Sequence, residues 1–158
     1  MKSLILGTFA IDDISLPKQN LKEVVGGAAS YAALASTLFT STSVGGVAGH
    51  DFPQEFVNKL VKKGVNVDNI QRSKRPSFRW KALYSNDLVD LQTTYQSMNA
   101  AEDLDIEKID STSMNVANTV FFSNLDPAVQ LTMINKIPEH TIKLLDSMDL
   151  WIVEKREI

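Results

Sequence analysis

The sequence contains no cysteine, only two histidines and no long apolar run. The lack of cysteine excludes disulfides, thiolate metal sites and cysteine nucleophiles, and it suits the reducing cytoplasm, where we expect the protein. His50 and His140 have no acidic or histidine partner at ligand spacing, so the sequence indicates no metal site. The apolar start at 4–6 is too short for a signal peptide or a membrane span, so no membrane partner is expected.

An excess of charge of either sign is also missing. The formal net charge is −3, which gives no reason to expect a nucleic-acid partner. The basic stretch 72–75 is short and typical of a solvated loop. The 158 residues, of which 44% are hydrophobic, are enough for one α/β domain with a core of its own.

Short apolar runs alternate with helical patterns along the chain. Buried strands are expected at 3–6, 43–47 and 119–123, a fourth strand at 142–145, and helices at 28–39, 52–63 and 126–137. This alternation predicts βαβ units in a mostly parallel sheet with flanking helices.

The two longer helical patterns each show an apolar stripe that should face the sheet. The stripe of the first helix is predicted to be Ala28, Tyr31, Ala32, Ala35 and Phe39. The stripe of the second helix is predicted to be Phe52, Phe56, Val57, Leu60 and Val61, with Asp51 as N-cap, Pro53 in the first turn and Gly64 as the stop.

Two stretches do not follow this rhythm. Residues 11–25 alternate loosely between apolar and polar types, and residues 78–84 and 88–94 have the pattern of a hairpin. We expect the two stretches to pair in a small separate sheet. Trp80 lies on an aromatic face of the hairpin that either packs internally or covers a ligand. Residues 98–115 are polar and irregular, with one short helix at most.

Polar residues gather where the predicted strands end, which is where open parallel sheets bind ligands. They are Asp12, the pair Gly26-Gly27, Asn124 with Asp126, and Asp146. Carboxylates accept strong hydrogen bonds from hydroxyls, and glycines let backbone amides approach a ligand. The pattern predicts a pocket for a small polyhydroxylated molecule.

Each of these residues also has a purely structural explanation. Asp12 can be a turn residue, and Asp126 can be a helix N-cap before proline. The pair Gly26-Gly27 is common before helices and lacks the full glycine pattern of a dinucleotide site or a P-loop. A dinucleotide-binding oxidoreductase is disfavoured because the first strand is followed by Gly7 alone, without the required glycine spacing.

The order of the motifs resembles the N-terminal half of the ribokinase-like (PfkB) carbohydrate kinase family. The segments that carry the resemblance are 7–12, 26–32, 47–52, 120–127 and 145–151. The resemblance implies an α/β, ribokinase-like fold: a Rossmann-like, mostly parallel sheet flanked by helices, truncated before the ATP-binding half. Its core would comprise 1–13, 26–72 and 112–158, and its small β-lid 14–25 and 76–97.

The resemblance also implies an activity: transfer of the γ-phosphoryl group of ATP, assisted by Mg²⁺, to a hydroxyl of a sugar or nucleoside substrate. Asp12 and Asp126 would accept hydrogen bonds from substrate hydroxyls, and Gly26 and Gly27 would contact the substrate through their backbone. Tyr31 stands where the family often has a substrate-binding asparagine. The lid hairpin with Trp80 would roof the cavity.

The family's catalytic G-A-G-D motif and nucleotide-binding segments have no counterpart in these residues. We therefore expect no catalytic residue here, poor binding of ATP and Mg²⁺, and no turnover by the chain alone. An unpaired sheet edge predicts a marginal, aggregation-prone fragment unless a C-terminal partner chain completes it. The lid strands could instead form a homodimer. The alternative is a non-catalytic small-molecule-binding or interaction module with a Rossmann-like fold.

Overall fold

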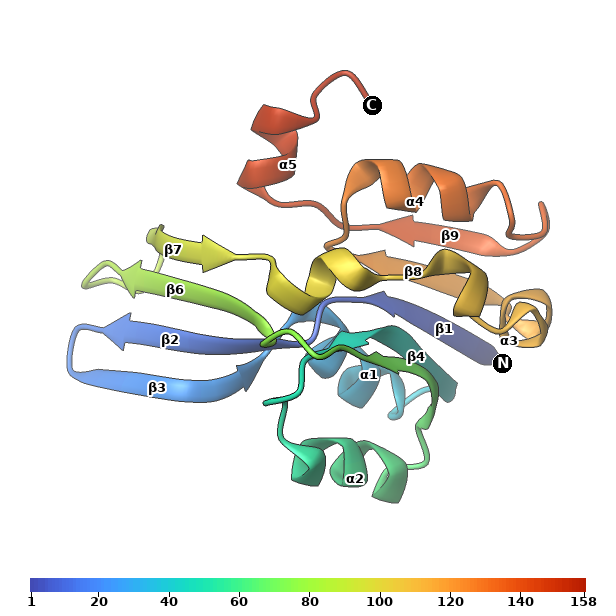
Figure 1. Cartoon of the computed structure of the whole chain (residues 1–158), viewed down its shortest axis with the longest axis horizontal. Coiled ribbons are helices and arrows are strands. Elements are labelled where there is room, and N and C mark those ends of the chain that lie inside the picture. Colours follow the sequence, from blue (N-terminus) through green and yellow to red (C-terminus); the bar gives the residue numbers. More distant parts are fainter.

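The computed structural model describes residues 1–158 and contains two sheets (Figure 1). The larger sheet is parallel, in the order β5-β4-β1-β8-β9. Its strands are β1 (Lys2–Gly7), β4 (Ser41–Ala48), β5 (Asn66–Arg72), β8 (Thr119–Ser123) and β9 (Ile142–Leu145). The helices are α1 (Ala28–Ser36), α2 (Gln54–Lys62), α3 (Ser111–Val116), α4 (Pro127–Ile134) and α5 (Asp149–Glu154), with short 3₁₀ helices η1 (Asn99–Asp103) and η2 (Ile106–Lys108). None of these helices has the length and apolar character needed to cross a bilayer.

The central strand β1 contributes side chains to two separate hydrophobic cores, because its side chains alternate between the two faces of the sheet. Ile5 packs with residues of α1 and α2 on one face, whereas Leu4 and Leu6 pack with residues of α3 and α4 on the other. Figure 1 shows these helix pairs on opposite sides of the larger sheet. The arrangement confirms the predicted α/β fold with a helix-flanked parallel sheet.

The smaller sheet, in the order β3-β2-β6-β7, projects from the end of the larger one (Figure 1). Its strands are β2 (Ala10–Leu16), β3 (Gln19–Gly26), β6 (Phe78–Tyr84) and β7 (Leu91–Ser97). The prediction that the two irregular stretches pair with each other is confirmed, because β2 lies beside β6 in parallel. The last strand of the hairpin was expected to begin at Leu88 but begins at Leu91, because a longer turn precedes it.

The predicted inward stripe of the first helix is wrong. The buried residues of α1 are Ala29, Ser30 and Ala33, whereas Tyr31 and Phe39 are exposed. The helix also ends at Ser36, before Phe39. Small side chains are needed on the inward face because β1 approaches closely there.

Several details of the second helix differ from the prediction, since α2 begins at Gln54 rather than Phe52 and Pro53 precedes its first turn instead of lying in it. Asp51 does not cap α2, whose N-cap is Pro53, and Val61 is exposed. The carboxylate of Asp51 instead accepts hydrogen bonds from the Ser77 backbone N–H (2.7 Å) and from Arg79 (2.5 Å). Asp51 therefore ties the larger sheet's connections to the base of β6.

Some elements are not in the prediction at all. Strand β5 makes the larger sheet five-stranded rather than four-stranded, and Arg72 is its last residue rather than part of a loop. The stretch 98–115 holds η1, η2 and the start of α3 rather than a single short helix. Asp126 caps α4 as expected, although α4 ends at Ile134.

Candidate functional site

A cavity of about 390 Å³ lies where the smaller sheet meets the carboxyl ends of β1 and β8. β1 and β8 flank the topological switch point of the larger sheet, where the strand order reverses. Open α/β sheets usually bind their ligands at this point. Residues from five separate elements and loops meet there: Thr8, Asp12, Gly27, Trp80 and Asn124 all line the cavity. The structure therefore brings three of the predicted site residues together.

Asp12 is the most unusual group in the cavity. Its side chain is 8% exposed, and its buried Oδ1 atom has no hydrogen-bond partner in the protein. Burial, with the neighbouring charge of Asp13 as a second cause, raises the pKa of Asp12 to about 6. An ionised carboxylate with an unused acceptor is suited to a ligand that supplies hydroxyl donors.

The two glycines of the turn have different tasks. A Cβ atom on Gly26 would collide with the carboxylate of Asp12, so this glycine makes room for the acid and does not line the cavity. Gly27 has a φ of 90° and its missing Cβ would collide with the carbonyl oxygen of Thr8. Gly27 is the N-cap of α1, so the cavity faces the amide end of that helix.

Asn124 follows β8 directly and is one of the polar strand-end residues singled out in the sequence, although the family resemblance gave it no binding role. Its φ of 45° turns the chain at the strand end. Its Oδ1 accepts a hydrogen bond from Trp151 Nε1 (3.1 Å), and its Nδ2 lies 3.2 Å from Met148 Sδ. The amide is therefore held in one orientation. Thr8, directly after β1, also lines the cavity and was missed by the sequence analysis; the signal that could have found it is the same as for Asn124, a polar residue at the end of a buried strand.

Three other candidate residues lie outside this cavity. Tyr31 is 57% exposed and donates its hydroxyl hydrogen to the carbonyl of Val25 (2.7 Å). Asp126 accepts a hydrogen bond from Ala128 N–H (2.8 Å) at the start of α4 and lines an adjoining cavity. Asp146 accepts the N–H of the next residue, Ser147, beyond the end of β9.

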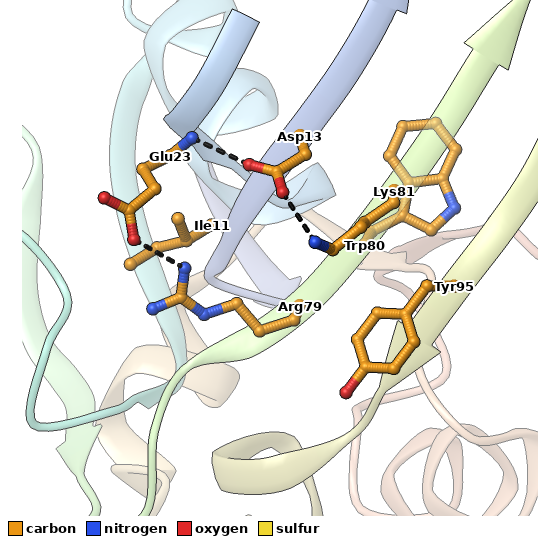
Figure 2. A pocket seen from close by; sticks show the side chains of 7 residues that line it. All are labelled: Ile11, Asp13, Glu23, Arg79, Trp80, Lys81 and Tyr95. Carbon is orange, nitrogen blue, oxygen red and sulfur yellow. Dashed lines mark hydrogen bonds and ion pairs between the residues drawn. The ribbon is translucent and has the colours of Figure 1, made fainter.

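The opposite face of the smaller sheet carries a second hollow, of about 490 Å³, shown in Figure 2. Its charged groups satisfy one another. Asp13 accepts hydrogen bonds from the Glu23 N–H and from Lys81, each 2.9 Å long, and Lys81 is the main reason why the pKa of Asp13 is lowered. Arg79 pairs with Glu23 (3.5 Å) and with Asp51 (2.5 Å). These pairs fasten neighbouring strands together, so the Asp12 side is the better candidate site.

The carboxylates do not gather around a metal position. No three side chains of histidine, aspartate or glutamate come together in a way that could hold a metal ion. We therefore assign Mg²⁺ to no residue of this chain.

Comparison with known proteins gives the fold. The ribokinase from Cryptococcus neoformans in complex with ADP superposes with a TM-score of 0.78 and 15% identity, over 94% of this chain and 50% of that one. A sugar kinase from Pyrococcus horikoshii superposes with a TM-score of 0.75 and 18% sequence identity, over 98% of this chain and 59% of that one. The fructokinase from Xylella fastidiosa with bound ATP superposes with a TM-score of 0.74 and 17% sequence identity, over 95% of this chain and 53% of that one. The chain has the ribokinase-like fold.

The expectation drawn from the motifs is thereby confirmed for the fold. The chain spans about half the length of these sugar kinases, which fits the expected N-terminal half. No sequence-family profile and no curated protein sequence matches the chain.

Proposed function

We propose that the chain is the substrate-binding and lid half of an ATP-dependent carbohydrate or nucleoside kinase. The observation that supports this proposal is the partnerless Oδ1 of Asp12 in a cavity at the carboxyl ends of β1 and β8. A hydroxylated ligand would supply the missing donors. The fold that the chain shares with several sugar kinases supports the same class of ligand.

The residues of the chain would bind and orient the substrate. Ionised Asp12 would accept hydrogen bonds from neighbouring hydroxyls and fix the ring. Gly27 would present the amide end of α1 without a side chain in the way. The smaller sheet, with Trp80 on the cavity side, would act as a lid that excludes water from the hydroxyl to be phosphorylated.

The phosphoryl-transfer step would belong to the complete enzyme. ATP would supply the γ-phosphoryl group there, and a further polypeptide segment or partner chain would supply the base and the nucleotide site. The cytoplasm stays our prediction for the location, and a homodimer through the lid stays a prediction as well.

The proposal is tested by titration calorimetry at pH 7.5 with a panel of pentoses, hexoses and nucleosides. Asp12→Asn keeps the shape of the side chain and removes its charge. Because charged hydrogen bonds contribute about 1.5 to 3 kcal/mol, we expect the affinity for the best ligand to fall roughly 10- to 100-fold.

Asp13→Asn is the matched control, because Asp13 is the next residue on the same strand and points to the opposite face. Its affinity should stay within about twofold of the unsubstituted chain. Equal losses for both variants, or binding of no member of the panel, would contradict the proposal.

A further inference from the structure

The cavity with Asp12 is not isolated. A second cavity, of about 480 Å³, adjoins it, and Thr8 and Asn124 line both. We call them the Asp12 chamber and the Trp151 chamber, and the position of Thr8 and Asn124 the neck. The second chamber is closed by segments that follow the smaller sheet, by the first turn of α4 and by α5.

The walls of the Trp151 chamber are mainly carbon. Met98, Leu125, Val129, Leu150 and Trp151 all line it. The indole N–H of Trp151 is already used by Asn124, so it is not available to a ligand.

Two of the three acidic residues that line the Trp151 chamber are paired with a cation, and the third, Glu154, is exposed to solvent. Glu102 pairs with Arg75 (2.8 Å), and Asp126 lies 3.8 Å from Lys155 Nζ. The chamber therefore offers mostly apolar contact, with Gln96 and Glu154 as further polar groups on its lining.

The hydroxyl group at the neck is that of Thr8. Thr8 Oγ accepts a hydrogen bond from Ala28 N–H (3.4 Å), and its own hydrogen is given to no atom of the protein. Its side chain is almost completely buried. A ligand that passes through the neck with a ring or bridging oxygen would give that hydrogen an acceptor.

We propose that the substrate is a glycoside with an apolar or aromatic substituent, a class that includes nucleosides, and not a free monosaccharide. The sugar ring occupies the Asp12 chamber, its bridging bond passes Thr8 and Asn124, and the substituent fills the Trp151 chamber. This inference rests on the proposed function and names its substrate class. A free sugar fills only the Asp12 chamber and leaves water in contact with the apolar walls of the Trp151 chamber. Its binding therefore lacks the favourable free energy that comes from burying apolar surface.

The test compares ligands that differ only in the substituent. Calorimetric titrations at pH 7.5 use D-ribose against adenosine and D-glucose against phenyl β-D-glucoside. At least one glycoside should bind about tenfold or more tightly than its parent sugar, since a buried ring removes a large apolar area from water. Val129→Trp fills the Trp151 chamber and should abolish this gain without changing the affinity for the parent sugar.

Leu131→Trp is the matched control, because Leu131 lies on the same helix with a side chain that is 52% exposed and lines only a different hollow. Leu150→Glu is a second test of the chamber, used if circular dichroism shows that Val129→Trp does not fold. It places a charge against the apolar substituent and should also abolish the tighter binding of the glycoside. Parent sugars that bind as tightly as their glycosides and still depend on Asp12 would overturn this inference alone. Binding of neither class would overturn the proposed function as well.

Discussion

Two adjacent aspartates show how position on a strand sets the chemistry of a side chain. Asp12 and Asp13 follow each other on β2 and point to opposite faces of the smaller sheet. Burial raises the pKa of Asp12, whereas the hydrogen bond from Lys81 is the main cause of the lowered pKa of Asp13. The sequence shows two equal carboxylates, and only the neighbours across the sheet distinguish them.

Ligand affinity should depend on pH through Asp12. The ionised form accepts hydrogen bonds from hydroxyls, so the affinity should rise as the pH increases through about 6 and level off above pH 7. Asp13→Asn should move this midpoint to lower pH, because the charge of Asp13 helps to raise the pKa of Asp12. Titrations between pH 4.5 and 8 measure both effects. A flat profile would contradict the assignment of Asp12 as the acceptor.

The same group should make the fold less stable at neutral pH. The pKa of Asp12 is about 6 in the folded state and 3.8 in the reference state, so the folded chain binds more protons between these values. The free energy of unfolding contributed by Asp12 is therefore complete below about pH 4 and is lost as the pH rises through about 6. Asp12→Asn should stabilise the chain by roughly 3 kcal/mol at pH 7.5 and by almost nothing at pH 3.5.

Urea unfolding of both proteins at the two pH values measures this difference. An equal effect of the substitution at both would show that the charge of Asp12 is not the cause. A more stable but weaker-binding variant would mean that the site has been kept at the expense of stability.

Elements with strong apolar runs could be predicted from the sequence, and elements with polar or uniformly small residues could not. β8 and β9 match their predicted bounds because each is a short, mainly apolar run, closed by Ser123 in β8 and followed by Asp146 after β9. β5 has the polar sequence Asn-Val-Asp-Asn-Ile-Gln-Arg, which is typical of an edge strand and carries no buried-strand pattern. In α1, alanine occurs on every side, so no period in the sequence indicates which face is buried.

The inward face of α1 is decided instead by distance from the sheet. Ala29 lies next to Gly7, where an added Cβ would come within 3.3 Å of the Ala29 side chain. A larger residue such as Tyr31 cannot occupy that position and is therefore on the outside. Steric limits of this kind depend on segments that are far apart in the chain, so the sequence pattern does not show them.

The base of the smaller sheet should depend on Asp51. Its pKa is lowered although burial acts in the opposite direction, because Ser77 and Arg79 donate hydrogen bonds to it. Asp51→Ala should destabilise the chain by about 1 to 3 kcal/mol, since it leaves buried donors without a partner. Hydrogen exchange in β6 should become faster. Glu23→Gln, which alters an exposed partner of the same arginine, is the control and should change neither quantity.

At the scale of the whole molecule, the larger sheet has an open edge. β9 pairs only with β8, and Ile142, Leu144 and Leu145 on it are all exposed. An edge with apolar side chains and unpaired backbone groups is a template for another strand. We therefore expect the isolated chain to self-associate at micromolar concentration.

Leu144→Lys should reduce this self-association, because a charge on an edge strand opposes pairing. Analytical ultracentrifugation should show a larger monomer fraction for this variant than for the unsubstituted chain. Leu38→Lys, at an exposed position after α1, is the control and should have no such effect. A chain that is already a stable monomer, with a cooperative thermal transition, would contradict the prediction.

The candidate site could be predicted in part for the same physical reason. Asp12, Gly27 and Trp80 lie in one cavity as the motif order indicated, because strand ends of a parallel sheet meet at one edge. Asp126 lies in the adjoining cavity rather than beside Asp12, and one of its carboxylate oxygens accepts the amide hydrogen of Ala128. The Trp151 chamber could not be predicted, because its walls come from segments that are distant in the sequence.

The contact between Gly26 and Asp12 has a consequence for how this pocket can change over evolution. The carboxylate occupies the volume that any side chain at position 26 would need. A residue larger than glycine there would push the acid towards water, which would return its pKa towards an ordinary value and misplace the acceptor. Homologues that keep an aspartate at position 12 should therefore keep glycine at position 26. Homologues that lose the aspartate should be free to carry other residues at position 26. The two positions should mutate as a pair.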